Sequence, residues 1–312
     1  MTPTSLLYKK QLKTNIFSAL VCLTLTGIML IFSEKIKSGI YNGLVLCATN
    51  IIPTLFPFFI LSDLWTAEFE IKQDGLLSRF FEKLFGINGA ASVAFLSGII
   101  CGFPIGVKTA TELYDKKIIS KNELIHLCGF SNNPSAAFII SGVGAACLGN
   151  IYLGLFLFVS PFLSAVTVGI LFRKESQIIH NSNVISRQNF DFVSSVKNAG
   201  LNSIAVSSYI ILFSGVISLI SYVINNTAIT AVISTFFEVG TSVSLINGCE
   251  AINNNIKLVL IAFALGFSGF SVHLQAFSFM PTELSRKKYL FMKLSQAVIS
   301  ASFAYIYLLL TK

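Results

Sequence analysis

The chain has 312 residues, of which 54% are hydrophobic and 12% are charged, with a mean hydropathy of +0.76. Since a soluble domain carries about 25% charged residues, this composition indicates an integral membrane protein and leaves little chain for a soluble domain. The net charge of +8 does not indicate a nucleic-acid partner, because the basic residues lie in short loops beside apolar segments, where a positive-inside bias explains them.

Nine apolar segments are long enough to cross a bilayer, which takes about 17 to 25 residues each. In chain order they cover residues 15–33, 44–65, 89–107, 125–149, 151–172, 199–223, 228–248, 256–280 and 289–310. No cleavage site follows the first segment, so we expect it to stay as an anchor with its N-terminus inside. The sequence predicts an all-α polytopic membrane protein with about seven to nine transmembrane helices, including broken or re-entrant segments.

The distribution of Lys and Arg favours two re-entrant segments. If all nine segments cross, 10 basic residues lie inside and 12 outside, which is no bias. In the alternative, segment 89–107 enters and leaves on the inner side and segment 228–248 enters and leaves on the outer side. Then 18 basic residues lie inside and 4 lie outside. The positive-inside rule therefore favours the re-entrant arrangement.

The two parts of the chain resemble each other. An offset of 157 aligns Gly43 and Leu44 with Gly200 and Leu201, and offsets of 156 and 167 align residues 80–82 with 236–238 and 102–105 with 269–272. We therefore expect one membrane domain made of an anchor helix at 1–38, a first repeat at 39–172, a polar loop at 173–198 and a second repeat with the C-terminal helix at 199–312.

Gly102, Phe103 and Pro104 interrupt an apolar segment. A broken helix survives in a membrane only where it is buried in protein or lines a wet cavity, and breaks in repeated halves mark a transporter site near the midplane. Pro104 suits the first position of a new helix and Asn133 suits an N-cap. Each helix start is a seat for an anion, and Lys108 adds a full positive charge.

Structural alternatives explain part of this pattern. Gly98, Gly102 and Gly106 form a small-xxx-small face by which membrane helices pack, and residues 131–133 can be a polar turn between two helices. Glu238 and His273 are harder to explain, because ionisable residues in apolar segments are costly, although Glu238 can also sit at an interface or end a helix.

Two structural expectations follow from the breaks. We expect the carboxyl group of Glu238 to be protonated or paired with Lys108 or His273. We also expect residues 102–104 and 269–271 to lie close together, with Asn132 and Asn133 nearby.

The sequence indicates no enzyme activity, no metal and no cofactor. The six cysteines have no metal-site or disulfide spacing, and we find neither a nucleophile with its base nor a phosphate loop. Proton coupling, sodium coupling, downhill transport and a separate energising partner all remain open.

Three stretches resemble the YlbJ-type sporulation integral membrane proteins, relatives of the nucleoside-recognition Gate domain proteins. They are FLSGIICGFPIGVKTATELYDKKIISKNELIHLCGFSNNPSAAFIISGVGAACLGN (95–150), FALGFSGFSVHLQAFSF (263–279) and the glutamate-bearing FFEVGTSVSLINGCEA (236–251). The resemblance implies a permease of a spore-forming bacterium, located in the outer forespore membrane, that moves dipicolinate toward the forespore.

The binding site expected from these observations combines the helix breaks with nearby polar and aromatic side chains: Gly102, Phe103, Pro104, Lys108, Asn132, Asn133, Ser135, Glu238, Gly269, Phe270, Ser271, His273 and Gln275. Phe103 and Phe270 would form an aromatic wall for the small dianion. The expected partners are a small anionic metabolite or a nucleoside and the lipid membrane, with a second copy or other sporulation membrane proteins left open. Two rival functions remain: a nucleoside permease and a non-transporting scaffold for spore-envelope assembly.

Overall fold

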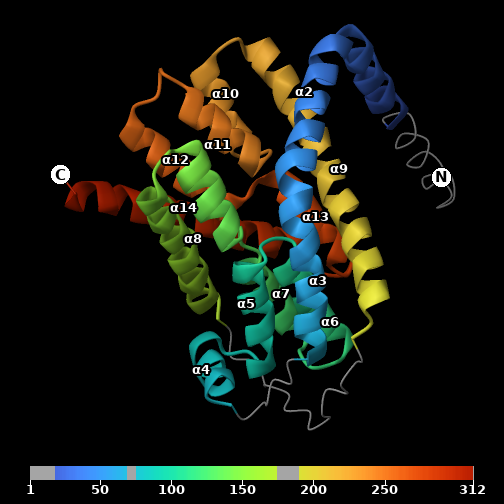
Figure 1. Cartoon of the computed structure of the whole chain (residues 1–312), viewed down its shortest axis with the longest axis vertical. Helices are drawn as coiled ribbons and strands as arrows, with labels where there is room; N and C mark the ends of the chain where they lie inside the picture. Colours follow the sequence, from blue (N-terminus) through green and yellow to red (C-terminus); the bar gives the residue numbers. More distant parts are fainter. Residues whose placement is uncertain (1–17, 69–74, 174–189, 312) are drawn as a thin grey trace, which may run out of the picture.

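The computed structural model describes residues 18–68, 75–173 and 190–311, and every regular element in these ranges is a helix (Figure 1). An unlabelled helix, Ser18–Ile31, comes first. The helices that follow are α2 (Ser33–Leu46), η1 (Cys47–Ile51), α3 (Ile52–Glu68), α4 (Leu76–Phe85), η2 (Gly89–Ala91), α5 (Ser92–Ile100), α6 (Ile105–Asp115), α7 (Lys121–Ser131), η3 (Phe138–Cys147), α8 (Ile151–Leu171), α9 (Phe192–Ile224), α10 (Thr227–Ser234), α11 (Val239–Gly248), α12 (Asn254–Phe267), α13 (Gly269–Phe279) and α14 (Arg286–Leu310).

The polytopic all-α fold is confirmed, with fewer uninterrupted spans than expected. Four described helical stretches are long and apolar enough to cross a membrane, namely α8, α9, Asn254–Phe279 and α14. Counting each of two bent helix pairs as one span raises this number to six. The sequence-based count of about seven to nine is higher because the segments 89–107, 125–149 and 228–248 are divided into shorter helices by breaks.

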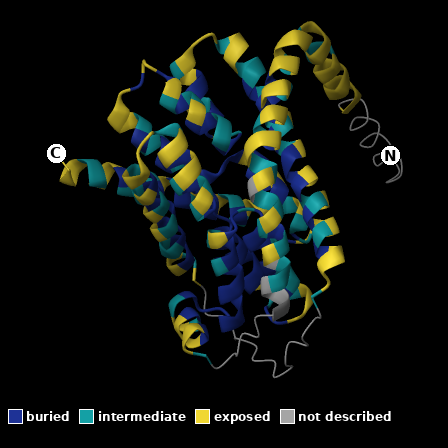
Figure 2. Cartoon of the chain, in the orientation of Figure 1, coloured by how far each residue is buried: buried dark blue, intermediate teal, exposed yellow. Residues whose placement is uncertain are grey.

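Large apolar side chains cover the outside of the molecule. Figure 2 shows exposed residues along the outer faces of α2 and α9 and buried residues gathered around α5 and α7. Tyr152, Val193 and Leu310 are 79%, 76% and 82% exposed. A surface of this kind is unfavourable in water and suits contact with lipid.

The same order of elements occurs twice along the chain. A long helical stretch (α2 to α3), a pair of short helices (α5 and α6), an interrupted helix (α7 and η3) and a further long helix (α8) come first. The stretch α9, the pair α10 and α11, the interrupted helix α12 and α13, and α14 repeat this order. α2 and α3 follow each other through η1, and both pack along α9 (Figure 1).

This order corrects two of the alignments drawn from the sequence. The break before Gly269 occupies the place of the break after α7, not the place of Gly102, and residues 80–82 lie on α4, which has no counterpart between α9 and α10. The local similarity has a common physical cause: Gly102 and Gly269 both adopt positive φ, +87° and +83°, which glycine tolerates best.

The two segments expected to re-enter are both helical hairpins. α5 packs against α6, and α10 packs against α11. In Figure 1 the two hairpins lie toward opposite ends of the long axis. Gly98 and Gly106 let α5 and α6 approach closely, because a Cβ atom on Gly98 would lie 3.2 Å from the Cα atom of Gly106.

Two boundaries differ from those expected. The helix Ser18–Ile31 bends by 86° into Ser33–Ile51, so the expected anchor and the start of the first repeat share one bent pair. α9 begins at Phe192, within the expected polar loop, because the Asp191 side chain accepts hydrogen bonds from the backbone of Val193 and Ser194. Residues 1–17, with Lys9, Lys10 and Lys13 of the ten basic residues counted inside, and residues 174–189 of the expected polar loop fall outside the described residues.

The close approach of glycine faces gives a direct test of the fold. A Cβ atom on Gly98 would lie 1.9 Å from the carbonyl oxygen of Ser131, so we expect Gly98→Ala to lower the unfolding temperature of the purified protein strongly, through a loss of about 1 to 3 kcal/mol or more. Gly200→Ala in α9 is the matched control, because no atom lies within 4 Å of its added Cβ and alanine favours a helix by about 0.5 to 1 kcal/mol. Equal unfolding temperatures for the two variants would contradict this packing.

Candidate functional site

The tip of the first hairpin contacts the chain that follows α7. A Cβ atom on Gly102 would lie 2.8 Å from both the backbone nitrogen and the Cβ atom of Ser135. The Phe103–Pro104 peptide bond is cis. Pro104 precedes the first residue of α6 and takes the N-cap position, so the expectation that it is the first helical residue is wrong by one position.

The stretch after α7 has no regular secondary structure and is buried at Asn132, Asn133 and Ser135. Asn133 is not a helix cap: its Nδ2 donates to the carbonyl oxygen of Phe130 at 2.7 Å, and its Oδ1 accepts from Gln296 at 2.7 Å. Ser135 takes the capping role instead, because its Oγ accepts a hydrogen bond from the backbone of Phe138 at 3.1 Å.

Two backbone donors remain free at this break. Within the ranges that the structure describes, the N–H groups of Ser135 and Ala136 have no hydrogen-bond acceptor. They lie at the start of the helical turn that leads into η3, beside the hairpin tip at Gly102. This helix start is therefore available to a ligand with negative charge.

The second hairpin and α13 close on each other through the main chain. The backbone N–H groups of Phe270 and Ser271 donate to the carbonyl oxygens of Phe236 and Phe237 at 2.7 and 2.9 Å. A Cβ atom on Gly269 would lie 3.0 Å from the Phe237 carbonyl oxygen. These bonds use N–H groups at the start of α13, so that this helix end has few donors left for a ligand.

Glu238 caps α11 with its own carboxylate. Its two oxygens accept hydrogen bonds from the backbone N–H groups of Gly240 and Thr241 at 2.9 and 2.5 Å. The expectation that Glu238 pairs with Lys108 or His273 is wrong, since neither residue forms an ion pair with it in the described parts of the chain. A helix start favours negative charge, and here the protein supplies that charge itself.

Lys108 is also engaged within the protein. Its Nζ lies 2.5 Å from Asp63 Oδ1 on α3 and 3.7 Å from Glu112 Oε1. Asp63 Oδ2 accepts a further hydrogen bond from Ser195 on α9 at 3.0 Å. The charge of Lys108 is thus compensated and joins the first hairpin to α3 and α9, which argues against the expected role as a free anion seat.

The two repeats meet at the hydroxyl group of Tyr289 on α14. Asn132 Nδ2 donates to this oxygen at 2.7 Å, and His273 Nδ1 lies 3.2 Å from it. The tip residue Phe103 packs against the cluster that contains Val239 and Val272. Asn132 after α7 and His273 on α13 thus share one partner on α14, and the hairpin tip packs against the same part of the interior.

Four buried polar atoms around this junction have no hydrogen-bond partner among the described residues: Ser131 Oγ, Asn132 Oδ1, His273 Nε2 and Gln275 Oε1. Gln275 is otherwise held by its Nε2, 3.3 Å from Ser271 Oγ. Buried polar groups are normally paired, and each exception calls for an explanation such as a missing ligand or water. These unpaired atoms make the junction a candidate place for a polar ligand.

The two aromatic residues of the expected wall lie on different elements. Phe103 is half-buried at the first hairpin tip. Phe270, on the first turn of α13, is 40% exposed, and its ring centroid lies 6.2 Å from that of His273. Phe270 therefore flanks the histidine, and no contact between the two phenylalanine rings is recorded among the described residues.

Sequence reasoning missed the α14 residues Tyr289, Lys293 and Gln296, which form one face of the helix and are all fully buried. Lys293 is one of the ten basic residues that the positive-inside count places inside. In the structure its Nζ lies 2.7 Å from the Asn132 carbonyl oxygen. A single lysine four residues inside an apolar segment was the available signal. Its spacing of four and three residues from Tyr289 and Gln296 placed all three on one helical face.

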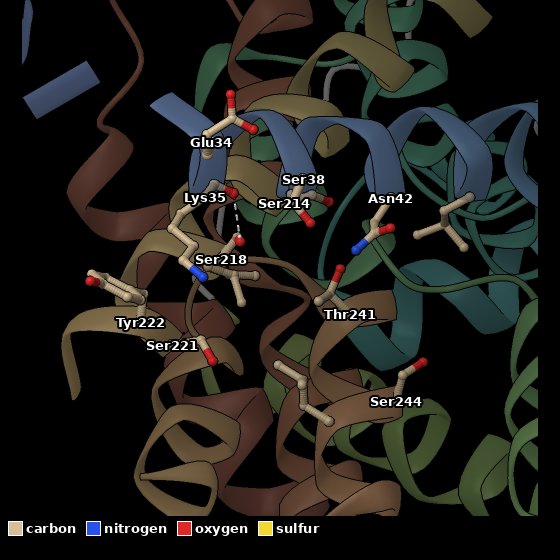
Figure 3. A pocket seen from close by; sticks show the side chains of 14 residues that line it. Glu34, Lys35, Ser38, Asn42, Ser214, Ser218, Ser221, Tyr222, Thr241 and Ser244 are labelled. Carbon is tan, nitrogen blue, oxygen red and sulfur yellow. Dashed lines mark hydrogen bonds between the residues drawn. The ribbon is translucent and has the colours of Figure 1, made fainter. Parts of the chain in front are cut away.

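A polar cavity of about 570 Å³ lies between α2, α9 and α11 (Figure 3). Lys35 lines it, with its Nζ 4.9 Å from the ring centroid of Tyr222. Thr241, which helps to hold the Glu238 carboxylate, lines the same cavity. None of the thirteen residues expected from the sequence lines this cavity, but it reaches the first turn of α11, next to the tip of the second hairpin.

Metal binding finds no support in the described parts of the chain, where no group of three or more His, Cys, Asp or Glu side chains is placed to hold an ion.

The Tyr289 hydroxyl group allows a test of the junction. Tyr289→Phe leaves the Asn132 amide and the His273 ring without their common partner, so we expect a loss of about 1 to 3 kcal/mol in stability and a lower unfolding temperature. Tyr305→Phe on the same helix is the control, because Tyr305 is 57% exposed. The junction would be unsupported if Tyr289→Phe unfolded at the temperature of the control.

The chain is similar to a characterised relative over most of its length. It is 27% identical to the sporulation integral membrane protein YlbJ of Bacillus subtilis (strain 168), in an alignment that covers 84% of this chain and 75% of that protein. No family model matches the chain, and no solved structure matches it. The chain is thus similar to the YlbJ-type sporulation integral membrane proteins over most of its length, and its helical membrane fold agrees with that similarity.

Proposed function

We propose that the protein is a permease that moves dipicolinate toward the developing forespore across the outer forespore membrane. The observation that carries the proposal is the junction of the two repeats, where broken helices leave buried donors and acceptors without partners. Interrupted helices in repeated halves are the architecture of transporter sites. The relative is a sporulation integral membrane protein by name, which supports a role in a spore-forming bacterium.

The junction offers donors for the carboxylates of a small aromatic dianion. The backbone N–H groups of Ser135 and Ala136 are free within the described chain. If the Tyr289 hydroxyl donates to His273 Nδ1, the ring carries its proton on Nε2, which then becomes a third donor. Asn132 Nδ2 already donates to the same hydroxyl oxygen, and this arrangement favours that tautomer.

Aromatic and charged groups complete the proposed site. Phe103 and Phe270 supply apolar faces for the pyridine ring. The positive charge comes from Lys293, which is bonded to the Asn132 carbonyl, because Lys108 is already compensated by Asp63. The site thereby binds an anion through oriented N–H groups, with the positive charge of one buried amine nearby.

The cavity between α2, α9 and α11 supplies an approach to this site. Its lining combines Lys35 with serine and threonine hydroxyl groups and the ring of Tyr222, a surface that suits an anion with an aromatic ring. Thr241 connects the cavity to the second hairpin. In the proposed path the substrate enters here and passes the tip of that hairpin.

Uptake into vesicles tests the proposal. We expect liposomes that contain the purified protein to accumulate labelled dipicolinate above empty liposomes, with labelled uridine left outside. Uptake of uridine alone would show a nucleoside permease, and uptake of neither would favour a scaffold.

Two histidine variants test the site within the same assay. His273→Asn keeps a polar group near Tyr289 but removes the Nε2 donor, so we expect the apparent affinity for dipicolinate to fall by about 10-fold or more. His273→Gln places an amide nearer the Nε2 position and should retain more of the affinity. The reverse order of the two variants would contradict the assigned donor.

A further inference from the structure

Lys293 is a buried amine held by oxygen atoms. The residue is 0% exposed and lies in the N-terminal third of α14. Its Nζ lies 2.7 Å from the backbone carbonyl oxygen of Asn132 and 2.7 Å from Gln296 Oε1. No carboxylate in the described chain lies within ion-pair distance of it. A buried charge normally needs an ionic partner or several dipoles, and here the partners are neutral oxygens.

The carbonyl that binds Lys293 belongs to a helix end. Asn132 is the C-cap of α7, with φ −87° and ψ 84°, so this oxygen lies where a helix leaves its last carbonyl groups without intrahelical donors. The partial negative charge of a helix C-terminus attracts cations. The neighbouring carbonyl of Ser131 lies against Gly98 and Gly106 of the first hairpin, which fixes the chain at this point.

The side-chain oxygen of Gln296 is also fixed. Its Nε2 donates to Asn133 Oδ1 at 2.7 Å and to the carbonyl oxygen of Pro161 at 3.2 Å. Both amide hydrogens are thus used on oxygen atoms, and the remaining atom of the amide, Oε1, faces Lys293. The orientation of this ligand is set by the protein around it, as in a built cation site.

We propose that the ammonium group of Lys293 is a resident cation, which fills a monovalent-cation site formed by the Asn132 carbonyl and the Gln296 amide oxygen. In transporters with broken helices, unwound carbonyls and helix C-termini coordinate the coupling ion. In this chain the ammonium group of Lys293 binds oxygen atoms of the same kind. The consequence is that these two oxygen atoms are not open to a small external cation such as sodium.

The same arrangement places a positive charge next to the proposed substrate site. Asn132 binds Lys293 through its carbonyl and Tyr289 through its side chain, and His273 lies on the other side of the Tyr289 hydroxyl. Only this step rests on the proposed function. The cation site itself is independent of the substrate that the protein moves.

The test restores the cation after the side chain is shortened. Lys293→Ala removes the propylammonium portion of the side chain, so we expect added propylammonium chloride to raise the unfolding temperature of the purified full-length variant by about 2 to 5 °C. Tetramethylammonium chloride at the same ionic strength is too large for the site and should have no such effect. Wild type and Lys287→Ala, which changes an exposed lysine of the same helix, should respond equally to both salts.

An unfolding temperature of Lys293→Ala that rises no more with propylammonium than with tetramethylammonium would overturn the proposal. If that variant cannot be purified, the wild type decides: its unfolding temperature should rise no more with sodium chloride than with choline chloride at the same ionic strength, and a rise specific to sodium would overturn the resident cation. Failure of the proposed function is recognised separately, because a protein that moves neither dipicolinate nor uridine still gives the stability result.

Discussion

The hydrogen bonds from Phe270 and Ser271 to the carbonyl groups of residues 236 and 237 illustrate the constraint on which the interior depends. Backbone groups at a helix break cannot be hydrated in hydrocarbon, so each must find a partner inside the protein. The second repeat meets this need by closing α13 on the hairpin of α10 and α11. The first repeat meets it less completely, since the Asn132 carbonyl takes Lys293 and the N–H groups of Ser135 and Ala136 stay free in the described chain. This difference leaves the free backbone donors of the proposed site at the first break.

Charge in the interior follows the same rule. Lys108 forms an ion pair with Asp63. Glu238 accepts hydrogen bonds from two backbone N–H groups, and Lys293 donates to two oxygen atoms. Each of these groups is therefore held in place, and none is a free seat for a substrate. The groups left for a substrate are the neutral polar atoms around the Tyr289 hydroxyl group. Lys293 lies next to them, because it is bonded to the carbonyl oxygen of Asn132. A dianion bound there would meet oriented dipoles and one amine, at little cost in reorganisation.

The sequence predicted the class of fold and the positions of the breaks, because composition and the Gly-Phe-Pro interruption depend on local chemistry alone. It did not predict what the polar side chains do. Glu238 and Lys108 were expected as partners, yet their hydrogen-bond geometry depends on which elements pack together, and Asp63 gave no signal before α3 was placed beside α6. The alignment of Gly102 with Gly269 failed for a related reason: both turns need a residue with positive φ, so similar sequences arose at breaks that differ in element order. Lys293 was visible as a lone charge in an apolar segment, but its partner across the repeats was not.

The most direct measurement is a structure of the protein with dipicolinate bound. The account predicts ligand density at the junction of the repeats, with a carboxylate within hydrogen-bond distance of His273 Nε2 and of the backbone N–H groups of Ser135 and Ala136, and with Lys293 still bonded to the Asn132 carbonyl. Density confined to the cavity between α2, α9 and α11, or a ligand that contacts none of these groups, would contradict it.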